Sequence, residues 1–133
     1  MNKEELLNFV NKQNPFFNNN HMRITEVTET EAFGELDVVP SVCNPFGNVH
    51  GGAYYTLADT TVGVLSRVDG KRNVTLEGGL NFLKGTNKGK VYSHAITVHK
   101  GRTTGVYNVT LYNDEKVPVA TGIFTMYFVN VEI

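Results

Sequence analysis

Asp59 is the residue whose surroundings in the sequence most clearly suggest chemistry. It is the single acidic residue between His50 and Arg67, a mostly apolar stretch of helical character with no basic residue inside it. No Lys or Arg therefore stands three or four positions away, where a helix would place a salt-bridge partner. A carboxylate that loses contact with water on an apolar face becomes a better base. Asp59 is accordingly a candidate general base or nucleophile, unless it caps a loop or bonds a surface group.

A second candidate group lies just before this apolar stretch, in the triplet His50-Gly51-Gly52. The sequence predicts that the helix begins here, so the Gly51 N–H would lie where free amides meet the positive end of the helix dipole. Such a donor stabilises developing negative charge, and a glycine lets a bound molecule come close. Tight packing at a helix start would also explain the two glycines. We interpret His50 as a structural histidine that fixes the preceding loop.

The elements that must position these groups follow from hydrophobic periodicity. A short amphipathic helix is predicted at 2–12, followed by a polar loop with Asn-Pro and a run of asparagines. Alternating patterns predict strands within 22–39 and at 74–83, 90–100, 103–112 and 117–131, with loops at 69–73 and 113–116. The last three strands follow one another closely and favour an antiparallel meander. The glycine pair Gly78-Gly79 inside one strand predicts room at a subunit interface or for a ligand.

The predicted fold class is α+β, with an antiparallel sheet wrapped around one long central helix that is apolar on most of its circumference. We expect one domain over residues 1–133. One helix face would pack on the sheet: Tyr54, Leu57, Ala58, Leu65 and Val68. The face left for a partner, which a second copy of the chain would cover, carries Gly52, Tyr55, Asp59, Val62 and Gly63.

Composition excludes several classes of function. The net charge of −1 gives no electrostatic reason to expect a nucleic-acid partner. Cys43 is the single cysteine, which excludes an internal disulfide framework and a cysteine metal cluster. His94 and His99 have no carboxylate or cysteine at ligand spacing, so no metal site is expected. No apolar run approaches the roughly 18 residues of a membrane span, and the acidic N-terminus is unlike a signal peptide, so we expect a cytoplasmic protein.

One combination of motifs resembles a known family. Asn44 stands six residues before His50-Gly51-Gly52, and Asp59 follows His50 by nine residues in Leu57-Ala58-Asp59. This combination resembles the hotdog-fold acyl-CoA thioesterases, and within them the phenylacetate-degradation type. The turn Lys100-Gly101-Arg102 and the final-strand pattern Val119-Ala120-Thr121-Gly122 are similar to the same family.

The resemblance implies a homodimer, commonly paired again into a homotetramer, with active sites at the dimer interface. Asn44 and Gly51 would come from one subunit and Asp59 and Thr75 from the other. Coenzyme A would enter as part of an acyl-CoA substrate, with no other cofactor. The residues expected around it are His50, Gly52, Lys100, Gly101 and Arg102.

The predicted function is hydrolysis of an acyl-CoA thioester, with Gly51 N–H polarising the carbonyl and Asp59 acting on water or on the carbonyl carbon. Thr75 would orient the water, and Asn44 would hold the thioester or the loop. Glu77 is the reserve candidate for the acid, because strand alternation would put it on the same face as Thr75.

One alternative is a non-catalytic hotdog domain that binds acyl-CoA. A more distant one is a hydratase or dehydratase, which the Asp59 and His50 spacing disfavours. The sequence leaves the acyl group open.

Overall fold

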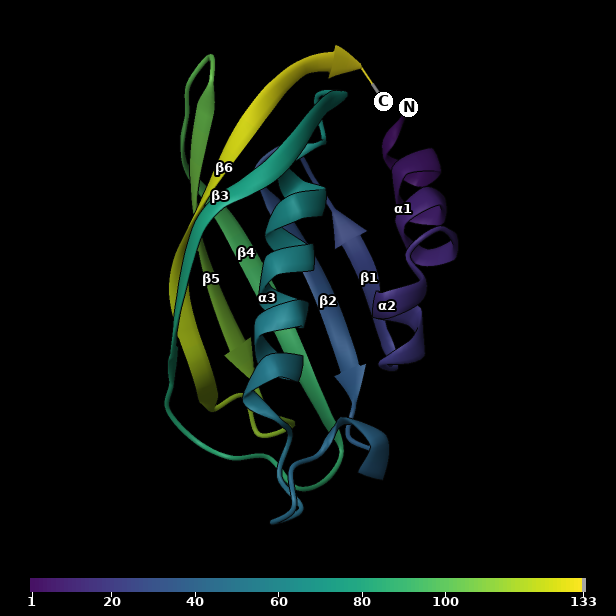
Figure 1. Cartoon of the computed structure of the whole chain (residues 1–133), viewed down its shortest axis with the longest axis vertical. Helices are drawn as coiled ribbons and strands as arrows, with labels where there is room; N and C mark the ends of the chain where they lie inside the picture. The colour runs from purple at the N-terminus through teal and green to yellow at the C-terminus, as the bar shows by residue number, and fades with distance from the viewer. Residues whose placement is uncertain (133) are drawn as a thin grey trace.

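The computed structural model describes the backbone of residues 1–132 and the side chains of residues 1–129. Figure 1 shows a curved sheet lying behind one long helix, with two shorter helices beside its β1 edge. In chain order the elements are α1 Lys3–Lys12, α2 Pro15–Asn19, β1 Met22–Val27, β2 Glu31–Asp37, the 3₁₀ turn η1 Pro40–Val42, α3 Gly51–Ser66, β3 Lys71–Phe82, β4 Lys90–Lys100, β5 Thr104–Tyr112 and β6 Pro118–Glu132.

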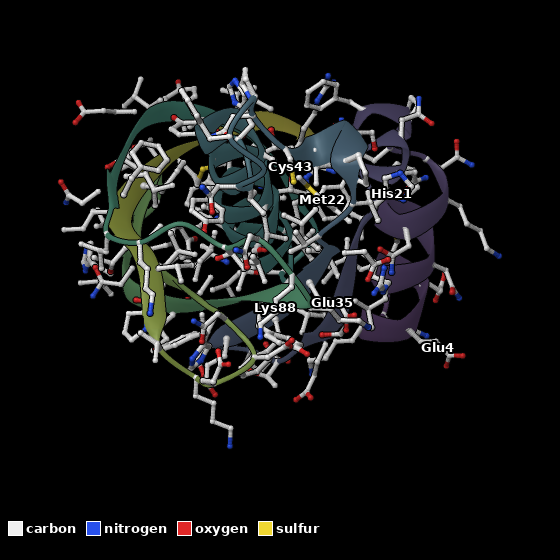
Figure 2. The ribbon with its side chains drawn as sticks, turned by 90° about the horizontal axis from the view of Figure 1, so that it is seen from below. Glu4, His21, Met22, Glu35, Cys43 and Lys88 are labelled. Carbon is white, nitrogen blue, oxygen red and sulfur yellow. The ribbon has the colours of Figure 1, made fainter. Side chains whose placement is uncertain are left out.

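Within residues 1–132 the six strands form one antiparallel sheet in the order β1-β2-β4-β5-β6-β3. The predicted meander of β4, β5 and β6 is confirmed. β3 pairs with the far side of β6, so it lies at the edge of the sheet. Seen end-on in Figure 2, the sheet curves around α3, and Glu4 projects from α1 into solvent. The predicted α+β arrangement of a sheet around a central helix is confirmed.

α3 is held against the sheet by the residues predicted to face it. Tyr54, Leu57, Ala58 and Leu65 are each at most 3% exposed. Val62 was predicted to lie on the uncovered face, yet it is fully buried. The prediction was wrong because α3 also contacts β1 and α2, so a wider arc of the helix is covered than one face of a sheet would cover.

Gly34 in β2 lets α3 approach the sheet closely. A Cβ atom there would lie 2.7 Å from the Ser93 hydroxyl and 3.1 Å from the Thr61 hydroxyl. These two buried hydroxyls are 2.7 Å apart and hydrogen bond to each other, which fixes α3 over β4. The distance of α3 from the sheet is therefore set by the lack of a side chain at Gly34 and by the hydrogen bond between Thr61 and Ser93.

Two predicted loops contain regular structure. Residues 15–19 form α2, with Asn14 accepting a hydrogen bond from the Phe17 N–H at 3.3 Å and Pro15 at the first helical position. The helix forms because Phe17 is fully buried. Residues 71–73 belong to β3, since pairing with β6 extends the strand across polar residues that local composition would assign to a loop.

One glycine of the pair in β3, Gly78, has a different cause from the one predicted. A Cβ at Gly78 would collide with Phe124 and lie 2.6 Å from the Tyr55 hydroxyl. Gly78 thus makes room for the chain's own side chains, and its carbonyl accepts a 3.2 Å hydrogen bond from Tyr55. A Cβ at Gly79 would meet no atom within 4 Å, so the predicted space for a partner or ligand stays a prediction there.

Among the described residues no helix has the length and apolar character needed to cross a lipid bilayer.

Candidate active site

The loop before α3 is organised by Asn44. Its side-chain oxygen accepts hydrogen bonds from the Phe46 N–H at 3.0 Å and from the Asn48 N–H at 3.2 Å. Its backbone N–H donates to the Asn48 carbonyl at 2.7 Å. Asn44 therefore closes a tight turn, as asparagine commonly does. Its side-chain NH₂ donates to no group among residues 1–129, which leaves that end of the amide for a ligand.

His50 fixes the start of α3. It is the N-cap residue, and its Nδ1 accepts a hydrogen bond from the Gly52 N–H at 2.8 Å. Its own N–H donates to the Val42 carbonyl at 2.8 Å, tying the cap to η1. The structural role predicted for His50 is confirmed. The same contact means that the Gly52 amide is already engaged and that Gly51 carries the free donor.

Gly51 is the first residue of α3, and within the described chain its N–H donates to no group. The Phe82 ring lies beside it, 3.4 Å from the position of a Cβ atom on Gly51. Phe82 also stacks on Tyr54 with ring centroids 6.3 Å apart. The result is an amide at the positive end of a 16-residue helix, next to an aromatic wall.

Asp59 lies two turns further along α3 and is paired with Thr75 of β3. The Thr75 hydroxyl donates to a carboxylate oxygen of Asp59 at 2.6 Å. Both residues line a cavity of about 230 Å³ between α3 and β3. The predicted placement of Asp59 and Thr75 in one subunit, side by side, agrees with this contact.

Gly51 and Asp59 cannot serve the same carbonyl within one chain. Eight residues separate them, which on an α-helix is about 12 Å along the axis. A rigid helix does not shorten that distance. Each chain therefore presents an amide donor at the start of α3 and a carboxylate in its middle, too far apart to act together.

The turn Lys100-Gly101-Arg102 lies at the other end of α3. Lys100 forms a 3.0 Å ion pair with Asp69, which follows the end of α3, and its ammonium lies 5.4 Å from the centre of the Phe128 ring. Gly101 N–H donates to the Thr104 carbonyl at 2.8 Å, and Arg102 is exposed. Within one chain this turn is thus separated from Gly51 by the length of the helix.

Glu77 does not share a face with Thr75, contrary to the expectation from strand alternation. Thr75 pairs with Met126 and Glu77 with its neighbour Thr125, because a bulge at Leu76 interrupts the register. Directly paired residues point to the same face. Met126 is 2% exposed, so Thr75 faces the helix and Glu77 the opposite side of the sheet. The bulge removes Glu77 as a candidate acid.

His94 has no carboxylate at ligand spacing in the sequence, but the fold brings one to it. Its Nε2 lies 2.7 Å from a carboxylate oxygen of Glu31 on the neighbouring strand β2, and its ring stacks on Phe33. Strand pairing creates this contact across 63 positions, which local spacing does not reveal. In the described chain no three His, Cys, Asp or Glu residues are placed to share a metal ion.

Two cavity-lining residues had no role in the sequence-based prediction. Asn73 is 6% exposed, and its side-chain NH₂ donates to the Gly63 carbonyl at 3.1 Å and to the Ser66 hydroxyl. Arg67, the C-cap of α3, lines the cavity of Asp59. The signal for Arg67 was present in its spacing, since it follows Asp59 by eight residues, two helical turns.

Comparison with known proteins identifies the family and the fold of the chain. The family model described as the thioesterase superfamily matches residues 46–120. The Bacillus subtilis protein ComA2 is 34% identical over 71% of this chain and 79% of its own length. A hypothetical thioesterase of Streptococcus pneumoniae, solved with coenzyme A, is 31% identical with a TM-score of 0.79, covering 84% of this chain and 88% of that one. The Escherichia coli PaaI structure is 21% identical with a TM-score of 0.92, covering 98% and 95%, and it confirms the predicted hotdog fold.

Proposed function

The chain belongs to the thioesterase superfamily, and we propose from this that it hydrolyses acyl-CoA thioesters to a free acid and coenzyme A. The observation that carries the proposal is the carboxylate of Asp59, which accepts a hydrogen bond from Thr75 and lines a cavity along the apolar helix α3. The coenzyme A bound to the Streptococcus pneumoniae relative supports the choice of thioester.

In the proposed reaction the Gly51 N–H donates to the thioester carbonyl oxygen. The donor is aimed along the helix axis, so it stabilises the negative charge that the oxygen gains as the carbonyl carbon becomes tetrahedral. The Asn44 NH₂ group, left unused by its own turn, would hold the thioester or the loop nearby.

Asp59 acts as general base or as nucleophile. As a base it takes a proton from water, whose oxygen then attacks the carbonyl carbon. The carbon–sulfur bond breaks, and the coenzyme A thiolate leaves and takes up the proton that Asp59 accepted. As a nucleophile, Asp59 attacks the carbonyl carbon and expels the coenzyme A thiolate, and water then hydrolyses the resulting anhydride to the free acid and restores the carboxylate. Thr75 keeps one carboxylate oxygen in place in either route.

We propose that two copies of the chain complete each site. The 12-residue β3 pairs with β6 on one side, and in the described chain no strand covers its other side. An exposed strand edge is a template for pairing with another chain. Pairing of β3 with β3 of a second copy would bring the Asp59 and Thr75 of one subunit toward the Gly51 of the other. Further pairing to a homotetramer is part of this proposal.

Coenzyme A would lie across the subunit boundary. His50 and Gly52 shape the site through the cap rather than through free donors. Lys100, Gly101 and Arg102 of a neighbouring subunit would contact the coenzyme A phosphates. Asp69 engages Lys100, whereas no carboxylate among the described side chains pairs with Arg102, so its guanidinium could bind a phosphate through two N–H groups. A cytoplasmic location and catalysis without a further cofactor complete the proposal.

The test is thiol release from a panel of acyl-CoAs by the wild type, Asp59→Asn and Glu77→Gln. Glu77 is the matched control, because it is an acid on the same strand as Thr75 that faces the other side of the sheet. Asp59→Asn should lower kcat by roughly 10² to 10⁴, the usual contribution of a general base, whereas Glu77→Gln should keep wild-type activity.

Two results would contradict the proposal. Full activity of Asp59→Asn would remove Asp59 from the mechanism. Binding of acyl-CoA without thiol release from any acyl group would identify a non-catalytic acyl-CoA-binding domain.

A further inference from the structure

The cavity beside Asp59 continues along α3 toward its C-terminal end. One row of the helix, at four-residue spacing, places Asp59, Gly63 and Arg67 along the cavity wall. β3 and β6 form the opposite wall with Asn73, Thr75 and Met126. The row from Asp59 to Arg67 spans about 12 Å along the helix axis. An elongated ligand with one end bound at Asp59 would therefore extend toward Arg67.

Gly63 opens the middle of this row. A Cβ atom there would have no heavy atom within 4 Å. The backbone at this point is fixed, because the Gly63 carbonyl accepts hydrogen bonds from the Asn73 side chain at 3.1 Å and from Ser66 at 2.9 Å. The open space above Gly63 is thus a formed groove with a rigid floor.

Arg67 closes the groove with a guanidinium group that forms no ion pair among the described side chains. Its side chain is partly buried. Burial, with the nearby Arg72 guanidinium, lowers the pKa of Arg67 from its usual value. The guanidinium stays protonated in proteins, so an anion at this position would relieve an unfavourable charge.

We propose that this groove binds the acyl group and that Arg67 recognises a carboxylate at its far end. The substrate class would be coenzyme A thioesters of short dicarboxylic acids, joined to coenzyme A through one carboxyl group and ionised at the other. A cavity of about 230 Å³ has room for roughly eight water-sized groups, which suits such a chain. The inference rests on the proposed function, because Asp59 must mark the thioester end.

The competing explanation is that Arg67 packs its alkyl stem over the cavity and keeps its charge in water, as many surface arginines do. The two explanations differ in their effect on substrate choice. A packing residue would alter all acyl groups alike, whereas a recognising guanidinium alters those that carry a terminal anion.

The experiment compares kcat/KM for adipoyl-CoA and hexanoyl-CoA, which have the same chain length and differ in a terminal carboxylate against a methyl group. The wild type should favour adipoyl-CoA, and Arg67→Gln should lower that preference roughly ten- to a hundredfold with little change for hexanoyl-CoA. Arg72→Gln is the matched control, since Arg72 is a neighbouring guanidinium that does not line the cavity.

A second variant tests the groove itself. Gly63→Val places a side chain into open space, so the helix should fold normally, and it should slow adipoyl-CoA and hexanoyl-CoA but spare acetyl-CoA. Equal effects of Arg67→Gln on both long substrates, or equal effects of Gly63→Val on all three, would overturn this inference alone. Absence of thiol release from every acyl-CoA by the wild type would overturn the proposed function and this inference with it.

Discussion

Thr75 donates a direct hydrogen bond of 2.6 Å to the carboxylate of Asp59. A hydrogen bond to a charged group contributes about 1.5–3 kcal/mol, and here it fixes the orientation of the carboxylate. Thr75→Val keeps the shape and removes the donor. We expect kcat to fall roughly ten- to a hundredfold with little change in KM.

Thr75→Ser should keep most of the activity, because it retains the hydroxyl. Thr125→Val is the matched control, since Thr125 pairs with Glu77 and faces the other side of the sheet. An unchanged kcat for Thr75→Val in steady-state assays would remove Thr75 from the site.

Tyr107 carries a buried hydroxyl without a hydrogen-bond partner among the described residues. Burial, assisted by the charge of Asp69, raises the pKa of Tyr107 to about 12. The Tyr107 hydroxyl loses its hydration on folding and gains no hydrogen bond among the described residues in return. Tyr107→Phe removes this hydroxyl, so the free energy of unfolding should rise by about 1 kcal/mol.

Tyr54→Phe is the matched control for Tyr107→Phe. The Tyr54 hydroxyl is 2.6 Å from the Thr86 hydroxyl and 3.0 Å from the Lys84 carbonyl, so its loss should destabilise the protein by about 1 kcal/mol. Urea unfolding measures both changes. Destabilisation by Tyr107→Phe equal to that of Tyr54→Phe would mean that the Tyr107 hydroxyl has an unseen partner.

At the scale of single residues, Gly51 and Asp59 could be chosen as candidates from the sequence, because an acid without a nearby cation and a glycine at a helix start are local signals; their roles stay predictions. It was insufficient for Glu77, whose direction depends on the bulge at Leu76 and thus on the partner strand. Arg67 escaped notice because a charged residue at a helix end is typical of a solvated cap.

Among the elements, β1, β2 and β4 are joined by a cluster of charges on the sheet. The guanidinium of Arg23 in β1 donates hydrogen bonds to the carboxylates of Glu35 and Asp37 in β2. The ammonium of Lys90 in β4 lies 2.6 Å from a carboxylate oxygen of Glu35. Burial raises the pKa of Glu35, but the hydrogen bonds and charges of Lys90 and Arg23 outweigh it and lower the pKa. The hydrogen bond from Arg23 likewise lowers the pKa of Asp37.

Because both folded-state pKa values lie below the unfolded ones near 4, the stabilisation is present above that pH and is lost as the pH falls through the folded values. Urea unfolding at pH 7 and at pH 3 should therefore show a loss of stability that Glu35→Gln reduces. The effect should be modest, since the pairs are partly exposed to solvent. An identical pH dependence for wild type and Glu35→Gln would contradict this account.

Element boundaries were predictable where one periodicity dominated. The strand predicted at 90–100 and the helix predicted at 2–12 match β4 and α1 closely, since alternation or helical spacing extends over the whole segment. α2 was not predictable, because Asn and Pro favour turns and only the burial of Phe17 makes the helix stable. The start of β3 depends on its pairing with β6, 55 to 61 positions away in the chain, and the local composition does not indicate a strand there.

For the whole molecule, the sharing of sites between two chains can be tested by mixing inactive variants. Gly51→Pro removes the amide hydrogen while keeping a residue that suits the first position of a helix, and His50 already has the extended backbone that precedes a proline. Gly51→Pro and Asp59→Ala should each be nearly inactive. Unfolding and refolding them together should restore activity to about a quarter of the wild type, because mixed dimers form half of the population and keep one intact site.

Refolding each variant separately is the control and should restore nothing. Failure of the mixture to regain activity, with mixed dimers present by mass spectrometry, would place each site within one chain.

The sheet order could not be read from the sequence, because the separation of β3 from β4 depends on long-range pairing rather than on any local pattern. The shared site, which the family resemblance implied, stays a prediction. The eight-residue step from Gly51 to Asp59 supports it, because it fixes a distance of about 12 Å along α3 that one chain cannot close.

That fixed spacing on α3 has a genetic consequence. In the proposed dimer a chain with one defect leaves one of two sites working in each mixed pair. A chain defective at both Gly51 and Asp59 silences both sites, because each site then combines one intact residue with one faulty one. When such an allele is expressed equally with a normal one, only about a quarter of the dimers stay active, so the double defect would behave as dominant and either single defect would not.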